Sequence, residues 1–307
     1  MSRARRRSAE SPVWEGLFSE RCEEIRPSQK PPKIKKIKHA KKMNLPSKEK
    51  IVELADKYET ADFLKKDPSR FMHDFLPEKG GSVRDAEIIA FLSANLAFGR
   101  REQILAHIQN VVDLMAASKK TPAGWILDGD YEKHFGESRL SFYRMYTFLD
   151  MRNFFSNLRD FLRQKETLGE FFREKWEIAL AECREGEQIF LHSVIAGCFC
   201  TDCALISRSK SGAAKKLNMF LRWMVRDNSP VDLGLWKWYD KSRLLIPLDT
   251  HVMQESVKFG FLEKTSSGKP PSASLKTALA LSEKMQEYFP GDPARGDFAL
   301  FGLGADR

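Results

Sequence analysis

The segment from Asp249 to His251 contains the residue types that most clearly allow chemistry. It follows Pro247 and Leu248 and precedes a run with helical spacing of apolar residues, so the pattern predicts a helix that begins near Thr250. An aspartate at this position is a favoured N-cap, because its carboxylate accepts hydrogen bonds from the free N–H groups of the first turn. The same position holds an ionised, oriented carboxylate at the mouth of any cleft lined by helix N-termini. The pattern leaves both interpretations of Asp249 open.

A lysine pair, Lys215 and Lys216, lies at the start of a predicted helix over residues 213–226. A lysine becomes nucleophilic when a partly buried position lowers its pKa. A lysine pair at the edge of a helix is more commonly a solvated surface feature. The pattern therefore leaves open whether either amine takes part in a reaction.

The elements that must position these side chains are helices. From Ser47 onward, apolar residues recur at helical spacing, and no alternation typical of strands stands out. Ser82, three residues before Asp85, predicts the start of a helix that includes residues 87–98. The sequence thus predicts an all-α body over residues 47–307.

The net charge of +9 is concentrated in residues 1–46, which contain 13 Lys and Arg and 5 Asp and Glu. Pro27, Pro31 and Pro32 interrupt this segment, and it has few large apolar residues to bury, so we expect a basic tail that is disordered when free. Such a tail binds a phosphate backbone without reading sequence, or is simply solvated.

Apolar runs and cysteines limit the class of protein. No apolar run approaches the roughly 20 residues that span a bilayer, and no apolar signal core follows the first arginines. The five cysteines are an odd number, which favours reduced thiols over a disulfide framework. We therefore expect no membrane partner and a location in the cytoplasm, in association with the nucleoid if the chain is bacterial. We also expect a monomer.

Three segments resemble, in the same order, the endonuclease III and adenine glycosylase branch of the helix-hairpin-helix DNA glycosylases. FLSANLAF at 91–98 is similar to the buried helix with a Leu-Ser-Ala-Gln signature, AKKLNMFL at 214–221 to the stretch after the hairpin, and PLDTHV at 247–252 to the catalytic Val-Asp-Thr-His turn. DFALFGLGA at 297–305 is similar to a late helix of the adenine glycosylases. LRWMVR at 221–226, with the downstream DTHV, resembles an uncharacterised bacterial branch.

This resemblance implies a two-lobed helical fold with a central cleft and a role in base excision repair. Lys215 takes the position of the Schiff-base lysine, because it precedes Asn218 by three residues. Asp249 takes the position of the essential aspartate, which stabilises the oxocarbenium-like sugar as the base departs. The implied reaction is cleavage of the N-glycosidic bond of a damaged or mismatched base, with or without abasic-site lyase activity.

The resemblance also implies DNA contacts, although the hairpin of this chain, ISRSKSGAA at 206–214, has a single glycine where the family has several. Basic side chains and the helix N-terminus can take over phosphate binding there. The residues expected to contact DNA are Asn95, Arg208, Lys210, Gly212, Lys216 and His251.

No cofactor or metal is expected. The family's iron-sulfur cluster uses four cysteines after the aspartate, and none follows Cys203 here. The run Cys198, Cys200 and Cys203 offers three soft ligands beside His192, but buried structural cysteines are the more common reading of such a run.

Two alternative functions and the role of one tryptophan pair remain open. The chain could be a non-catalytic DNA- or RNA-binding protein on the same scaffold, with affinity from its basic tail. It could be a metal-dependent hydrolase that uses Asp249 and His251 with His73 or His107. Trp236 and Trp238, between Lys215 and Asp249 in the sequence, either stack on an extruded base or pack in the core.

Overall fold

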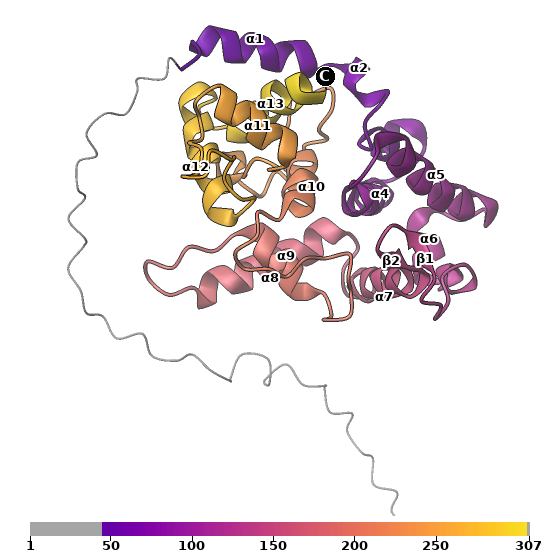
Figure 1. Cartoon of the computed structure of the whole chain (residues 1–307). Helices are drawn as coiled ribbons and strands as arrows, with labels where there is room; N and C mark the ends of the chain where they lie inside the picture. The colour runs from indigo at the N-terminus through magenta and orange to yellow at the C-terminus, as the bar shows by residue number, and fades with distance from the viewer. Residues whose placement is uncertain (1–44, 306–307) are drawn as a thin grey trace, which may run out of the picture. The chain divides into compact units, whose positions relative to one another are not determined.

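The structure is a computed structural model that describes residues 45–305. The predicted basic tail, residues 1–46, lies outside the described residues except for its last two positions. Within the described range the chain is mainly α-helical, which confirms the predicted all-α class (Figure 1). The α-helices are α1 (Lys48–Tyr58), α2 (Ala61–Leu64), α3 (Arg70–His73), α4 (Val83–Leu96), α5 (Arg101–Ala117), α6 (Pro122–Leu127), α7 (Phe148–Gln164), α8 (Leu168–Glu182), α9 (Leu191–Cys198), α10 (Lys215–Val225), α11 (Thr250–Lys258), α12 (Leu275–Tyr288) and α13 (Gly296–Ala305).

Shorter elements connect these helices. A two-stranded antiparallel hairpin precedes α7, and single turns of 3₁₀ helix occur at four points. No helix of the described residues combines the length and apolar character that a membrane span requires. These elements are β1 (Ser141–Tyr143), β2 (Tyr146–Thr147), η1 (Pro77–Lys79), η2 (Asp130–Lys133), η3 (Lys241–Arg243) and η4 (Pro293–Arg295).

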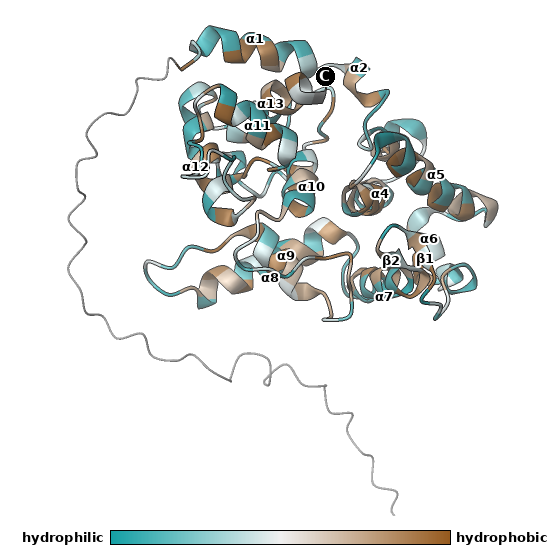
Figure 2. Ribbon diagram, in the orientation of Figure 1, coloured by the Kyte–Doolittle hydropathy of each residue, from teal (hydrophilic) through white to brown (hydrophobic). Residues whose placement is uncertain are grey.

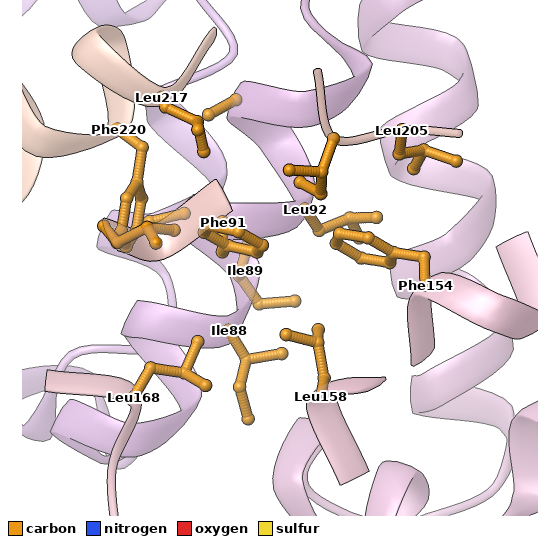
Figure 3. Packing of buried hydrophobic residues seen from close by; sticks show 14 of the residues in the cluster. Ile88, Ile89, Phe91, Leu92, Phe154, Leu158, Leu168, Leu205, Leu217 and Phe220 are labelled. Carbon is orange, nitrogen blue, oxygen red and sulfur yellow. The ribbon is translucent and has the colours of Figure 1, made fainter. Parts of the chain in front are cut away.

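Helix α4 forms the centre of the larger of two hydrophobic clusters. Ser82 caps it as predicted, since its Oγ accepts from the N–H of Asp85 at 3.1 Å. Phe91 stacks in parallel on Phe154 at a ring separation of 5.7 Å and meets the edge of Phe220 of α10 at 4.8 Å (Figure 3). Because aromatic rings pack against it from several elements, α4 is buried on every face after its first turn.

The second cluster joins the two ends of the described chain. Ile51 and Ala55 of α1 are fully buried together with residues of α11, α12 and α13, and α1 lies beside α13 in Figure 1. Gly302 of α13 makes this approach close, because an added Cβ there would overlap the ring of Tyr58. In Figure 2, α1 shows hydrophilic and hydrophobic residues side by side, as expected for a helix with one buried face.

Helix α10 contacts both hydrophobic clusters. Its apolar side chains, such as Phe220 and Leu221, belong to the larger cluster. Arg222 of the helix and Arg226, its C-cap, are almost fully buried, and both guanidinium groups lie over the ring of Phe298 of the second cluster, at 4.4 and 5.4 Å. A helix with buried residues on every side is typical of an element that joins two packed layers.

The buried arginines of α10 are compensated by carboxylates from four other segments. Arg222 pairs with Asp232 at 3.2 Å and with Asp297, and Arg226 pairs with Glu59 at 2.9 Å, with Asp292 at 2.8 Å and with Asp232. Buried charges require such partners, because an unpaired ion in the core is strongly unfavourable. We call Arg222, Arg226 and their carboxylate partners the buried ion-pair network.

Candidate active site

Asp249 begins helix α11 as its N-cap, as the sequence predicts. Its Oδ1 accepts a hydrogen bond from the N–H of Val252 at 2.9 Å. The preceding residue, Leu248, is buried in the second cluster, so the backbone on the N-terminal side of the cap is fixed by packing. The Asp249 side chain retains 14% of its exposure. The cap therefore holds the carboxylate in one orientation, with Oδ1 bound to the Val252 N–H and Oδ2 facing Lys215.

Lys215 is the first residue of α10 and lies beside Asp249. The distance between Lys215 Nζ and Asp249 Oδ2 is 3.3 Å, and 32% of the lysine side chain is exposed. Ala214, the N-cap, has a left-handed backbone (φ 46°, ψ 43°), and the amide of Asn218 closes the turn by donating to the Ala213 carbonyl at 2.9 Å. This sharp turn starts the helix at the lysine. The structure thus brings together the two residues predicted to be catalytic.

The segment that connects α10 to α11 folds back on α10. The N–H of Leu233 donates to Trp223 O and the N–H of Trp236 to Met224 O, both at 2.7 Å. Trp236 is buried, and its indole N–H donates to Glu87 Oε1 at 2.7 Å. Trp238 stacks on Trp236 with a ring separation of 5.3 Å. Trp236 therefore packs in the core, and Trp238 packs against it while remaining partly exposed.

Lys216, next to Lys215, points in a different direction. Its Nζ donates to the hydroxyl of Tyr146 at 2.8 Å and to the carbonyls of Asn95 at 3.4 Å and of Leu205. Burial lowers the pKa of Lys216 to about 8, and the charge of Lys215 acts in the same direction. Because its amine is enclosed by three segments of the protein, Lys216 is not available for the DNA contact that the sequence predicted.

Asn95 also lies away from the surface. It is fully buried, and its amide donates to the Phe91 carbonyl at 2.9 Å. The DNA contact predicted for Asn95 would need a rearrangement of α4. The reason is local: Asn95 lies in the last turn of a helix that is buried on every face.

The other predicted DNA contacts lie on the surface. Arg208 and Lys210 are exposed in the loop before α10. Gly212 forms an isolated bridge with Ser274, and its N–H donates to Ser209 Oγ at 3.1 Å, so this N–H is already used. His251 is exposed in the first turn of α11, with its ring 6.4 Å from Phe301.

Metal coordination finds little support in the described residues. No group of three or more His, Cys, Asp or Glu side chains there is arranged to hold an ion. One ring nitrogen of His73 lies 2.9 Å from the Val231 carbonyl, and one of His107 lies 2.8 Å from the Gln103 carbonyl. Each histidine therefore makes a hydrogen bond to a backbone carbonyl with one of its two ring nitrogens. Burial raises the pKa of both Cys198 and Cys203 to about 12, which disfavours the thiolates that bind metals.

Asp297 is a member of the site that the sequence analysis missed. It lies in the first turn of α13 and pairs with Arg222 of α10. Burial raises its pKa to about 7; Arg222 opposes this shift, and the charge of Asp249 adds to it. The electrostatic effect of Asp249 and Lys215 on Asp297 connects the exposed pair to the buried ion-pair network. Asp297 begins the segment DFALFGLGA that resembles a late helix of the adenine glycosylases, but an aspartate in a first turn is equally typical of a helix start, so it was not singled out.

A second missed feature is the surface formed by the segments around Lys216. Tyr143 of the hairpin donates to the Phe98 carbonyl, and the guanidinium group of Arg144 lies over the Phe98 ring at 4.9 Å from its centre. Arg100, after the end of α4, is exposed like Arg144. Arg100, Arg144, Arg208 and Lys210 are exposed and lie on or close in sequence to the three segments that contact Lys216. No sequence motif groups them.

Comparison with known proteins identifies a family but no activity. No curated protein and no solved structure matches the chain. One family model matches residues 67–306, a range that includes Lys215, Asp249 and Asp297 and excludes the basic tail. Since this range is more than half of the sequence, the chain belongs to the family described as Protein of unknown function (DUF2400).

Proposed function

We propose that the chain is a DNA glycosylase that cleaves the N-glycosidic bond of a damaged or mismatched base, with Asp249 and Lys215 as its catalytic residues. The observation that carries the proposal is the distance of 3.3 Å between the Lys215 amine and the Asp249 carboxylate. The fold that goes with this proposal is a two-lobed helical fold with a central cleft.

The chemistry follows from the two groups. As the bond between C1′ and the base breaks, its electron pair leaves with the base and positive charge develops on the sugar. The Asp249 carboxylate stabilises that charge and accepts a proton from the Lys215 ammonium group. The neutral amine then attacks C1′ and forms a C–N bond; a proton passes from the bound nitrogen to O4′ as the C1′–O4′ bond breaks, and the opened sugar remains joined to the lysine as a protonated Schiff base. The cap of α11 keeps the carboxylate in place during these steps.

DNA binding is supported by exposed cations close to Lys215 in the sequence. Arg208 and Lys210 are exposed in the loop that leads directly into Lys215. Helix α10 has no acidic residue in its first turn and no side-chain cap at its N-terminus. Exposed cations and a free helix N-terminus both favour phosphate groups.

The test is trapping with borohydride, which reduces a Schiff base to a stable amine and so links the protein to DNA. Full-length protein is incubated with a duplex that contains one abasic site. We expect a cross-linked product that Lys215→Ala loses and that Lys276→Ala keeps, because Lys276 is an exposed lysine in the first turn of another helix, α12. Equal trapping by Lys215→Ala would remove Lys215 from the proposed role. A panel of duplexes with single altered bases then identifies the base that is released.

A non-catalytic DNA- or RNA-binding protein is the second candidate. The observation that favours it is the position of the charge, since residues 1–46 account for +8 of the net charge of +9. In that case deletion of residues 1–42 abolishes binding to duplex DNA or to RNA, and substitution of Asp249 or Lys215 has no effect on it. The affinity of the full-length protein and of the protein without residues 1–42 is measured at several salt concentrations. Each phosphate contact that the deletion removes lowers the salt dependence of binding, so this comparison separates the two candidates.

A further inference from the structure

A pocket that contains neither of the proposed catalytic residues is lined by residues of α2, α3, η1 and α5 and of their ends. Its volume is about 440 Å³, within the range of roughly 300–1,000 Å³ that is typical of sites for small ligands. The charged side chains of its lining are Lys65, Arg70, Asp74 and Lys79. Three cations and one carboxylate give the lining an excess of positive charge. We call this site the Arg70 pocket.

The two lysines of the Arg70 pocket have carboxylate partners at the surface. Lys79 pairs with Asp74 at 2.7 Å and Lys65 with Asp62 at 2.8 Å, and every side chain of these two pairs is more than half exposed. Exposed ion pairs of this kind contribute little to stability, because water competes for both partners. Each lysine can therefore exchange its carboxylate for another anion at little cost.

Arg70 is the cation of the pocket without a carboxylate partner. No Asp or Glu of the described residues forms an ion pair with it, although its side chain is only partly exposed. Its guanidinium group lies over the ring of the buried Phe71, 4.7 Å from the ring centre, and Nη1 donates to the Lys65 carbonyl at 3.4 Å. A guanidinium group has five N–H donors, so most of them remain available to a ligand. The pocket therefore presents a positioned guanidinium group whose charge is not neutralised by a neighbour.

Two polar side chains of the pocket are held by other parts of the chain. The Nε2 atom of His73 lies 2.9 Å from the carbonyl oxygen of Val231, which belongs to the segment that connects α10 to α11. Gln109 of α5 donates to Asp113 of the same helix at 2.8 Å. A lining that is already held in this way has less conformational entropy to lose when a ligand binds.

We propose that the Arg70 pocket binds the phosphate group of a phosphate ester, with Arg70 as its main ligand and Lys65 and Lys79 as further donors. The planar fork of a guanidinium group matches two oxygens of a phosphate group, and a phosphate ester carries the negative charge that the lining lacks. The volume of the pocket leaves room for the group to which the phosphate is bound. The ester is either a small molecule or the backbone of a nucleic acid, since both present the same phosphate chemistry.

The test is the protection of Arg70 from phenylglyoxal, a reagent that modifies arginine side chains. Full-length protein is labelled at constant ionic strength, and mass spectrometry gives the rates at Arg70 and at Arg173, a surface arginine of α8 that pairs with Glu177. We expect adenosine monophosphate to slow the labelling of Arg70 several-fold, and adenosine, which lacks the phosphate group, to leave it unchanged. The rate at Arg173 should not change with either compound.

A short DNA duplex without damaged bases is the second probe in the same assay. Slower labelling of Arg70 with the duplex identifies a nucleic-acid backbone as the source of the phosphate, and protection by adenosine monophosphate alone identifies a small ester. Protection by adenosine, equal slowing at Arg70 and Arg173, or no protection by either phosphate probe would overturn the proposal.

Two matched variants measure the contribution of the guanidinium group. Arg70→Gln removes the charge but keeps a donor for the Lys65 carbonyl, and Arg173→Gln is the control. Arg70→Gln should bind the protecting probe at least about tenfold more weakly, because charge-assisted hydrogen bonds are lost, and Arg173→Gln should bind it like the wild type. If the duplex is that probe, Arg70→Gln should also lower the salt dependence of binding by about one phosphate contact. Urea unfolding confirms that both variants are folded.

The outcome is separate from that of the proposed function. Wild-type affinity in Arg70→Gln would overturn the phosphate site whether or not the protein releases a base. Phosphate binding that depends on Arg70, in a wild-type protein that shows no borohydride trapping and no base release, would reject the proposed function and leave the Arg70 pocket standing.

Discussion

Asp249 has two roles that one substitution separates. As the N-cap of α11 it makes a 2.9 Å hydrogen bond to the N–H of Val252, and such a cap contributes about 1 kcal/mol. Its ion pair with Lys215 is partly exposed, so it contributes less than about 1 kcal/mol. Asparagine keeps the cap and loses the charge. Asp249→Asn should therefore lower the free energy of unfolding by less than about 1 kcal/mol, and Asp249→Ala by about 1–2 kcal/mol.

Activity should follow a different order. Because the proposed reaction needs the charge of Asp249 and not its capping ability, both variants should lose at least about a hundredfold in base release. Urea unfolding gives the stability of each variant, and single-turnover base release gives the activity. Wild-type activity in Asp249→Asn would refute the catalytic assignment. Equal stability losses in Asn and Ala would refute the argument that the cap and the chemistry are separate.

The other predictions concern stability. Burial raises the pKa of Glu87 to about 7, so its contribution to stability is full below its unfolded pKa of about 4.5 and is lost as pH rises through about 7. From pH 5 to pH 8, the free energy of unfolding of the wild type should therefore fall by ~2 kcal/mol relative to that of Glu87→Gln. A constant difference between the two proteins over this pH range would contradict the prediction. Asp232→Ala should lower the free energy of unfolding by about 3 kcal/mol, because it leaves two buried arginines with fewer carboxylate partners. The control Asp227→Ala, which removes a surface ion pair, should lower it by less than about 1 kcal/mol. Similar losses in the two variants would argue against the buried ion-pair network. Gly302→Ala should lower the free energy of unfolding in urea by about 1–3 kcal/mol, because the added Cβ overlaps the ring of Tyr58 and α1 must shift. An unchanged urea midpoint would show that α1 can shift without loss of stability.

Helix positions could be predicted from the sequence because they depend on local patterns. The helix predicted over residues 213–226 is Lys215–Val225 in the structure, and the predicted start at Asp249 is the observed cap of α11. The hairpin was missed, because strands of two and three residues are too short for an alternating pattern to appear. It is held by contacts with distant residues, such as that of Tyr143 with the Phe98 carbonyl.

The candidate site could be predicted only in part. Resemblance to a known family led to Lys215 and Asp249, and the structure brings them together, but the activity remains a prediction. The burial of Asn95 and Lys216 could not be foreseen, because it depends on packing by segments far away in the sequence. Asp297 was missed for the same reason, since its connection to the pair exists only after α13 packs on α11.

The buried ion-pair network has a consequence for how the protein unfolds. Its arginines belong to a helix of the larger hydrophobic cluster, and their carboxylate partners include Glu59, at the end of α1, and Asp297 of α13. If the second cluster opened alone, two guanidinium groups would remain in the first core without these partners, at a cost of several kcal/mol. Opening of either hydrophobic cluster alone is therefore unfavourable. The network couples the two cores into one cooperative unit, so that intermediates with only one core folded should be sparsely populated.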